Sequence, residues 1–140
     1  MDLKSLTYTS FARLDLTADD LAAIQRTARE RNSLDGTTGL LIYNGTHFLQ
    51  IVEGAQSAID DLVERLRRDP RHSGFEVRDE RAIKQLSFPD WSMELVLVKS
   101  DGFEAGASIS KRLPAGVPEA VRERLFAMTE LISGVVEMPD

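Results

Sequence analysis

Three side chains in the sequence, Tyr8, Gln50 and Asn32, could exchange hydrogen bonds inside a folded domain, and Gln50 is the unusual one. Tyr8 lies in an alternating segment, 3–10, that predicts a strand, and its phenol carries an O–H donor. Gln50 interrupts the apolar run 48–52, where a buried amide must satisfy one carbonyl and two N–H donors. Asn32 follows the first predicted helix, where asparagine commonly serves as a C-cap. Each residue also has a structural explanation: a half-buried strand tyrosine, a satisfied core amide and a helix cap.

Other polar candidates lie at the end of the second predicted helix and before the last predicted strand. Arg65 and Asp69 are spaced i, i+4, and the ordinary explanation is a solvated ion pair of little energetic value. Trp91-Ser92-Met93 would ordinarily be packing residues. The sequence shows no Ser/His/Asp arrangement, glycine-rich phosphate loop or close carboxylate pair on an apolar face. These residues alone therefore indicate a small domain with unusual buried amides.

Length and composition exclude several classes of function. The 140 residues are 42% apolar and 29% charged, which suits one ordinary folded domain. The net charge of −6 argues against direct binding to nucleic acid or to an anionic membrane. The absence of cysteine excludes disulfides and cysteinyl adducts, and two histidines without cysteine argue against a transition-metal site. No targeting or membrane-spanning segment stands out, so we expect a cytoplasmic protein.

The periodicity of apolar residues predicts the order β-α-β-β-α-β-β. Thr17, three residues before Asp20, favours a helix over 18–31, and a second helix is predicted over 56–68. Asn44-Gly45 between two apolar runs predicts a hairpin with a type I′ turn. The predicted strands cover 3–10, 39–43, 47–52, part of 75–86, and 93–98. We expect an α+β fold, a ferredoxin-like mixed five-stranded sheet with two helices on one face.

The second face of the predicted sheet is also apolar and needs a cover. Pro118 suits the first turn of a helix. An apolar stripe at steps of 4, 4, 3 and 4 follows, formed by Val117, Val121, Leu125, Met128 and Ile132. Residues 100–116 read as a connector. The predicted organisation is a core of residues 1–98 and a C-terminal connector and helical cap of residues 99–140.

Several short motifs follow one another along the predicted core. They are Tyr8-Thr9-Ser10, Asn32, Thr38-Gly39-Leu40-Leu41-Ile42-Tyr43, Phe48-Leu49-Gln50-Ile51-Val52-Glu53-Gly54, Asp69-Pro70-Arg71-His72 and Phe88-Pro89-Asp90-Trp91-Ser92-Met93. In this order and at these separations, the set resembles the BLUF family, blue-light sensors that use a flavin, over about residues 3–98. The length resembles that of short stand-alone members. The resemblance implies a photoreceptor without enzymatic turnover, with FAD as cofactor and FMN as an alternative.

The resemblance also implies a site and a mechanism. The flavin would lie between the two helices, against the sheet face that carries Tyr8 and Gln50. Tyr8 would give an electron and then a proton to the light-excited flavin. Gln50 would return rotated or tautomerised, with a new hydrogen bond to the flavin C4 carbonyl that produces a small red shift. Asn32 would hold the flavin C4=O and N3–H.

The remaining site residues are carried over from the family less directly. Ile24 and Phe48 would be apolar walls, with ordinary packing an equal explanation, and Arg65, Asp69 and Arg71 would lie along the ribityl and phosphate path. Trp91 and Met93 would form a switch pair on the last strand, with either one next to Gln50. Trp91 is also a competing electron donor or simply a strand-edge aromatic residue.

The light signal is expected to leave through the last strand, the connector and the tail helix. It would alter a homo-oligomer or a downstream signalling protein, without direct contact with nucleic acid or membrane. Two alternatives stay open: a metabolite-binding or small hydrolase module on the same fold, and an interaction adaptor without a chromophore. A flavin absorption spectrum separates the three.

Overall fold

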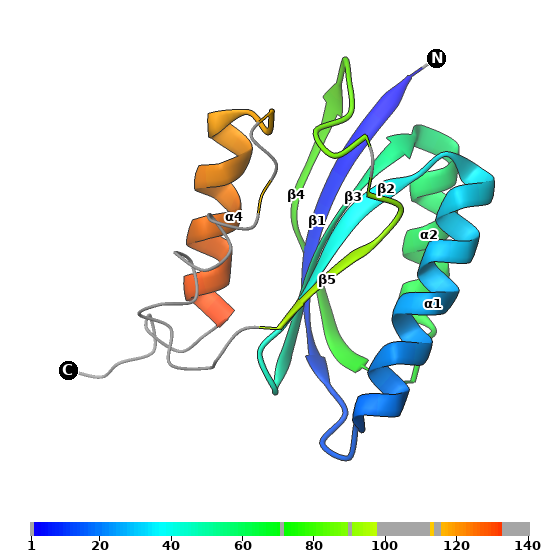
Figure 1. Ribbon diagram of the computed structural model, residues 1–140, viewed down its shortest axis with the longest axis vertical. Helices are drawn as coiled ribbons and strands as arrows, with labels where there is room; N and C mark the ends of the chain where they lie inside the picture. The colour runs from blue at the N-terminus through cyan, green and yellow to red at the C-terminus, as the bar shows by residue number, and fades with distance from the viewer. Residues whose placement is uncertain (1, 71, 90, 98–112, 114–115, 133–140) are drawn as a thin grey trace.

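The predicted alternation of strands and helices is present in the computed structural model, which describes residues 2–70, 72–89, 91–97, 113 and 116–132. In chain order the elements are β1 (Leu3–Ala12), α1 (Ala18–Asp35), β2 (Thr38–Tyr43), β3 (His47–Ala55), α2 (Gln56–Arg67), β4 (His72–Ile83), β5 (Glu94–Leu97) and α4 (Glu119–Ile132). The sheet order is β4-β1-β3-β2-β5, antiparallel throughout except for the parallel pair β2 and β5. Figure 1 shows α1 and α2 on one face and α4 on the other, which confirms the predicted fold class.

Helix α1 begins where the sequence predicts and ends later. The Thr17 side chain accepts a hydrogen bond from the Asp20 N–H at 3.1 Å, and the Asp20 carboxylate accepts one from the Thr17 N–H at 3.0 Å. The helix then continues to Asp35, because Gly36 adopts the left-handed conformation with φ of +72° and ends it. The interpretation of Asn32 as a C-cap is therefore wrong, since this residue lies in the last turn of the helix.

The predicted hairpin joins β2 to β3, but its turn is displaced by one residue. The Asn44 N–H donates to the His47 carbonyl at 3.3 Å, so Gly45 and Thr46 are the central residues. Gly45 has φ of +99°, a conformation that glycine adopts without strain. Asn44 stabilises the turn through its side-chain oxygen, which accepts from the N–H groups of Thr46 and His47.

Strand β4 begins three residues before the predicted segment. It pairs with β1 from Leu3↔Ile83 to Ala12↔His72, and this long pairing also extends β1 beyond the predicted Ser10. Strand β5 lies within the predicted range of 93–98, whose last residue falls outside the described residues. No helix in the described part of the chain is long and apolar enough to cross a bilayer.

Side chains alternate between two cores on opposite faces of the sheet. The face toward α1 and α2 carries Leu6, Tyr8, Leu41, Phe48, Val52 and Met93. The face toward α4 carries Leu40, Ile42, Leu49, Ile51 and Val96, which pack against Val117, Val121 and Leu125. The predicted cover over the second face is thus confirmed. Most of the predicted connector, 100–116, lies outside the described residues, as does the boundary placed at residue 98.

Candidate functional site

Two polar side chains meet in the core beneath α1 and α2. Tyr8 and Gln50 are register partners on β1 and β3, so both project from the same face of the sheet. They are 3% and 4% exposed, and the Tyr8 hydroxyl donates a hydrogen bond to Gln50 Oε1 at 2.5 Å. Strand alternation and register therefore suffice to bring the phenol and the amide together.

Burial keeps the phenol of Tyr8 protonated. Desolvation raises its pKa well above the ordinary value, and the negative charge of Asp69 raises it further. The Tyr8 ring also stacks on Phe75, with 4.5 Å between ring centroids. Tyr8 thus holds its proton in a fixed position, aimed at the oxygen of Gln50.

Met93 lies on the other side of the Gln50 amide. Gln50 Nε2 lies 3.3 Å from Met93 Sδ, and Met93 is 1% exposed. Helix α1 holds the Met93 backbone, because Gln25 Nε2 and Arg29 Nε donate to its carbonyl at 3.2 and 3.1 Å. Gly39 leaves room for the close approach, since a Cβ there would lie 3.1 Å from Met93 Cε and 2.5 Å from the Ile51 carbonyl oxygen.

Trp91 packs elsewhere. Its ring stacks on that of Phe88, with 5.6 Å between centroids, and it packs against the core on the α4 face. Its carbonyl accepts a hydrogen bond from the Gly39 N–H at 2.8 Å, which ties this segment to β2. In this structure Met93, and not Trp91, is the neighbour of Gln50.

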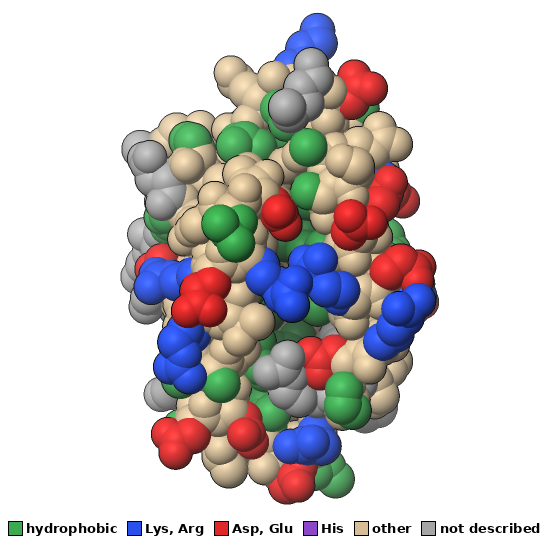
Figure 2. Space-filling model, turned by 90° about the vertical axis from the view of Figure 1, so that its right-hand side faces the viewer, with side chains coloured by type: hydrophobic (Ala, Val, Ile, Leu, Met, Phe, Trp, Pro, Cys, Tyr) green, Lys and Arg blue, Asp and Glu red, His purple; other side chains and the backbone are tan. Residues whose placement is uncertain are grey.

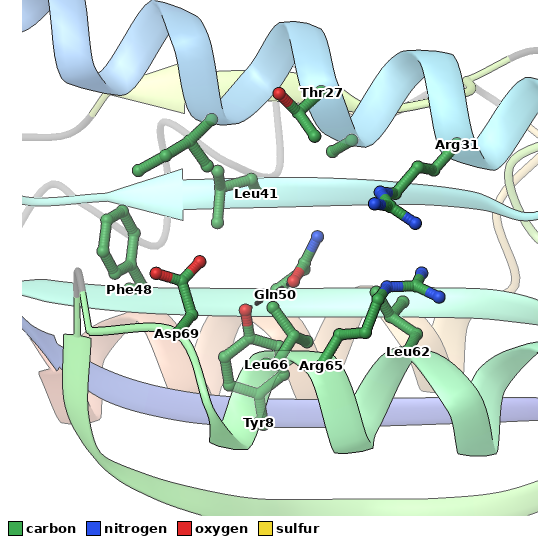
Figure 3. A pocket seen from close by; sticks show the side chains of 12 residues that line it. Tyr8, Thr27, Arg31, Leu41, Phe48, Gln50, Leu62, Arg65, Leu66 and Asp69 are labelled. Atoms are coloured by element: carbon green, nitrogen blue, oxygen red, sulfur yellow. Dashed lines mark hydrogen bonds between the residues drawn. The ribbon is translucent and has the colours of Figure 1, made fainter.

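A cavity of about 210 Å³ opens between α1, α2 and this face of the sheet. Figure 3 shows the side chains of both helices and the sheet pointing into it. Its lining includes six residues predicted from the sequence: Tyr8, Ile24, Phe48, Gln50, Arg65 and Asp69. The structure therefore places most of the predicted cofactor-binding residues around one space.

One described residue of the predicted cofactor-binding set, Asn32, is not in the lining. Asn32 is 3% exposed, and its Nδ2 donates to the Ser92 carbonyl at 2.6 Å, so its amide holds the segment before β5 in this structure. Arg71 lies outside the described residues.

Sequence reasoning missed the other lining residues, which are Thr27, Ala28, Arg31, Leu41, Leu62 and Leu66. Their spacing contained a usable signal. Thr27, Ala28 and Arg31 lie three, four and seven positions after Ile24, on one face of a helix. On α2, Leu62 lies three positions before Arg65 and four before Leu66, a spacing that again favours one helix face.

Comparison with known proteins identifies this arrangement. Residues 3–94 match the family described as BLUF, sensors of blue-light using FAD. The chain belongs to the BLUF family. Residues 3–94 include both members of the Tyr8–Gln50 pair and all the residues that line the cavity.

Individual relatives agree with this assignment. The chain is 35% identical over 92 residues to the photoactivated adenylate cyclase subunit beta of Euglena gracilis, a match to 65% of the chain and 11% of the cyclase. It is similar to the dark-state structure of the BLUF protein BlrB, with 40% identity, a TM-score of 0.72, and coverage of 91% of this chain and 96% of BlrB. It is also similar to a structure of Klebsiella pneumoniae BlrP1 with FMN and cyclic diGMP, at 27% identity and a TM-score of 0.76, covering 96% of this chain and 36% of BlrP1.

The chain spans about a tenth of the cyclase it matches, so the likeness is to a sensor domain and not to a catalytic one. BlrB, by contrast, is a BLUF protein that this chain covers almost end to end. These matches agree with the prediction of a sensor without enzymatic turnover.

The residues around the cavity fit a flavin. The side chains of Ile24, Leu41, Phe48, Leu62 and Leu66 offer apolar walls to a flat ring system. Tyr8 and Gln50 offer a hydroxyl and an amide in the same space, and the amide carries a donor and an acceptor on one group. Such walls with a few convergent polar groups are typical of cofactor sites.

Proposed function

We propose that this BLUF domain senses blue light through the linked side chains of Tyr8, Gln50 and Met93 beside a bound flavin. The observation that carries the proposal is the buried 2.5 Å hydrogen bond from Tyr8 to Gln50 at the wall of the cavity. FAD is the cofactor in the family description, and FMN, which is present in the BlrP1 structure, is the alternative.

A bound flavin supplies a strong one-electron acceptor when it absorbs blue light. Tyr8 is placed to respond, because its phenol lines the cavity and its proton points at Gln50 Oε1. Loss of an electron makes a phenol strongly acidic, so its proton would move along this short hydrogen bond. Tyr8 is therefore both the electron donor and the proton donor of the site.

Gln50 converts this event into a change of hydrogen bonding. In the present structure its oxygen accepts from Tyr8 and its nitrogen contacts Met93 Sδ. Rotation or tautomerisation of the amide exchanges donor and acceptor, so both neighbours gain or lose a partner at once. Asn32 would hold the carbonyl edge of the flavin after giving up its contact with the Ser92 carbonyl.

Strand β5 offers a route from the site to the opposite face of the sheet. Met93 precedes β5 on the cavity side, while Val96, three residues later, lies in the core that packs against α4. A displacement of Met93 would therefore change how α4 packs against the sheet. We infer that the output is a change in a homo-oligomer or in the binding of a signalling protein.

Absorption spectroscopy of the purified protein tests the function. We expect a flavin band that shifts to longer wavelength under blue light and returns in darkness. Protein that takes up FAD and FMN but shows no reversible shift would contradict the photochemical role. Failure to bind either flavin would contradict the proposed function altogether.

A further inference from the structure

The sheet face beneath α4 carries a buried carboxylate of which only one oxygen has a partner. Glu53 on β3 is 1% exposed, and its Oε1 accepts a hydrogen bond from the Ser87 N–H at 2.5 Å. Its Oε2 is buried and has no hydrogen-bond partner among the described residues. A buried carboxylate oxygen without a partner costs free energy, so its presence in the interface with α4 needs an explanation.

A buried cation on α4 has a spare donor. The Arg124 side chain is 12% exposed, and its Nη1 lies 3.5 Å from Asp79 Oδ2 on β4 without forming a hydrogen bond. Both oxygens of Asp79 already accept from Arg81, at 2.7 and 3.0 Å. Burial lowers the pKa of Arg124, and the negative charges of Asp79 and Glu53 oppose this effect. Two carboxylates therefore act on Arg124, while its Nη1 is hydrogen-bonded to neither.

Two hydroxyl groups lie between these carboxylates. Ser5 is the register partner of Glu53 and Thr7 that of Asp79, so all four side chains share one face, with β1 between the two acids. The hydroxyls of Ser5 and Thr7 are buried and also lack partners among the described residues. We call the row of Asp79, Thr7, Ser5 and Glu53 the polar strip. It lies on the sheet face that α4 covers, beside the apolar core of that face.

Exposed charges differ from those at the polar strip because water solvates them. Figure 2 shows Lys, Arg, Asp and Glu side chains spread over the opposite face, which carries α1 and α2. Arg68 and Glu64 on α2 form such an ion pair, with side chains 80% and 63% exposed. Pairs of this kind contribute little free energy. A pairing between Arg124 and Glu53, both shielded from water, would contribute more to the position of α4.

Glu53 is also connected to the photoactive side chains. It lies three residues after Gln50 on β3, and its hydrogen bond to Ser87 holds the start of the segment that leads to Met93. Gln50 Nε2 in turn contacts Met93 Sδ. A displacement of Met93 would therefore be transmitted through this segment to the Glu53 carboxylate beneath α4.

We propose that Arg124 moves along the polar strip from Asp79 in the dark state to Glu53 in the light-adapted state, which gives α4 two alternative positions on the sheet. The proposal rests on the proposed function and deepens it. In the light-adapted position, Glu53 Oε2 gains the partner that it lacks in the present structure. The hydroxyls of Ser5 and Thr7 offer hydrogen bonds between the two positions, so the buried cation is not left among apolar groups alone.

Dark-recovery kinetics of the flavin-loaded protein test this exchange, because the two carboxylates should act in opposite directions. Glu53→Gln keeps the side-chain length but removes the charge that stabilises the light-adapted position, so recovery should be about three- to tenfold faster. Asp79→Asn removes the charge that attracts Arg124 back, so recovery should be about two- to fivefold slower. Glu123→Gln, at an exposed position of α4, is the matched control and should recover like the wild type.

Combined variants separate the exchange from a merely structural role. In an Arg124→Gln background, neither Glu53→Gln nor Asp79→Asn should change the recovery rate further, because the moving charge is already gone. Should Glu53→Gln fail to fold, Asp79→Asn with and without Arg124→Gln tests the same coupling. Effects that persist without Arg124 would overturn the proposal.

The sign of the two single substitutions gives a further criterion. Recovery that changes in the same direction in Glu53→Gln and Asp79→Asn, or that equals the wild-type rate in both, would overturn the exchange while leaving the photoreceptor function intact. Absence of any reversible shift in the wild type would instead refute the proposed function.

Discussion

The Tyr8 hydroxyl donates a 2.5 Å hydrogen bond to Gln50 Oε1, and the two residues are register partners on adjacent strands of one sheet. The geometry of this pair is therefore fixed by the β1–β3 ladder and not by loops. A donor and an acceptor held on rigid elements need little reorganisation when a proton moves between them.

Replacing Tyr8 with phenylalanine should abolish the light-induced red shift while flavin stays bound. The substitution keeps the aromatic packing against Phe75 but removes the hydroxyl that supplies the proton. Difference spectra before and after illumination measure the effect. Tyr43→Phe is the matched control, because the Tyr43 hydroxyl bonds to the Gly45 carbonyl in the hairpin, away from Gln50. A normal photocycle in Tyr8→Phe would refute the role of Tyr8.

The two residues of the expected switch pair should respond differently to substitution. Met93→Leu keeps much of the buried volume but removes the sulfur atom. In the wild type this sulfur contacts Gln50 Nε2 and stabilises the present orientation of the amide. We expect the red-shifted state to persist about two- to fivefold longer, as the loss of one weak contact implies. Dark-recovery kinetics measure this.

Trp91→Phe is the comparison for Met93→Leu. Because the Trp91 ring stacks on Phe88 and packs on the α4 side, we expect dark recovery to change less than in Met93→Leu. A larger effect from Trp91→Phe would mean that Trp91, and not Met93, governs the state of Gln50.

Most of the fold could be predicted from local patterns. Alternation located the strands, Thr17 marked the start of α1, and the apolar stripe from Val117 to Ile132 indicated a cover for the second sheet face. The end of α1 could not be predicted from Asn32, because two competing signals, Asn32 and Gly36, lie four residues apart. In the structure Gly36 ends the helix, and Asn32 in the last turn bonds instead to the Ser92 carbonyl of the segment before β5.

Strand register and helical periodicity were enough to predict part of the site. Tyr8, Gln50 and Ile24 lie where those rules place them, on the sheet face and helix face that line the cavity. The choice between Met93 and Trp91 was not predictable, because it depends on tertiary contacts. Gln25 and Arg29 on α1 hold the Met93 carbonyl, and the sequence alone does not show that α1 reaches it.

Helix α4 should contribute stability through one buried position more than through its outer surface. Leu125 is 0% exposed and packs in the core formed with the sheet, so Leu125→Ala should lower the free energy of unfolding by about 2–5 kcal/mol. Phe126→Ala, at the adjacent exposed position, should lower it by less than about 1 kcal/mol. Denaturant unfolding of both variants measures the difference. Equal losses would show that α4 does not pack on the sheet as described.

Tyr8 should make the stability of the apoprotein depend on pH in the alkaline range. Burial, together with the charge of Asp69, raises the pKa of Tyr8 in the folded chain, whereas in the unfolded chain the pKa returns to its ordinary value of 10.0. Below that pH both states keep the proton, and the group adds no pH dependence. Above it the unfolded chain binds fewer protons than the folded chain, so stability falls as pH rises, by up to about 1.4 kcal/mol per pH unit.

Comparison of the wild type with Tyr8→Phe isolates this contribution. Urea unfolding of both apoproteins, measured at several pH values from neutral to strongly alkaline, should show a steeper alkaline loss of stability in the wild type. The difference in slope should appear only above a pH of about 10, where the unfolded phenol begins to ionise. Identical slopes in the two proteins would mean that Tyr8 ionises as readily in the folded chain as in the unfolded one, which would contradict its burial as a proton-holding group.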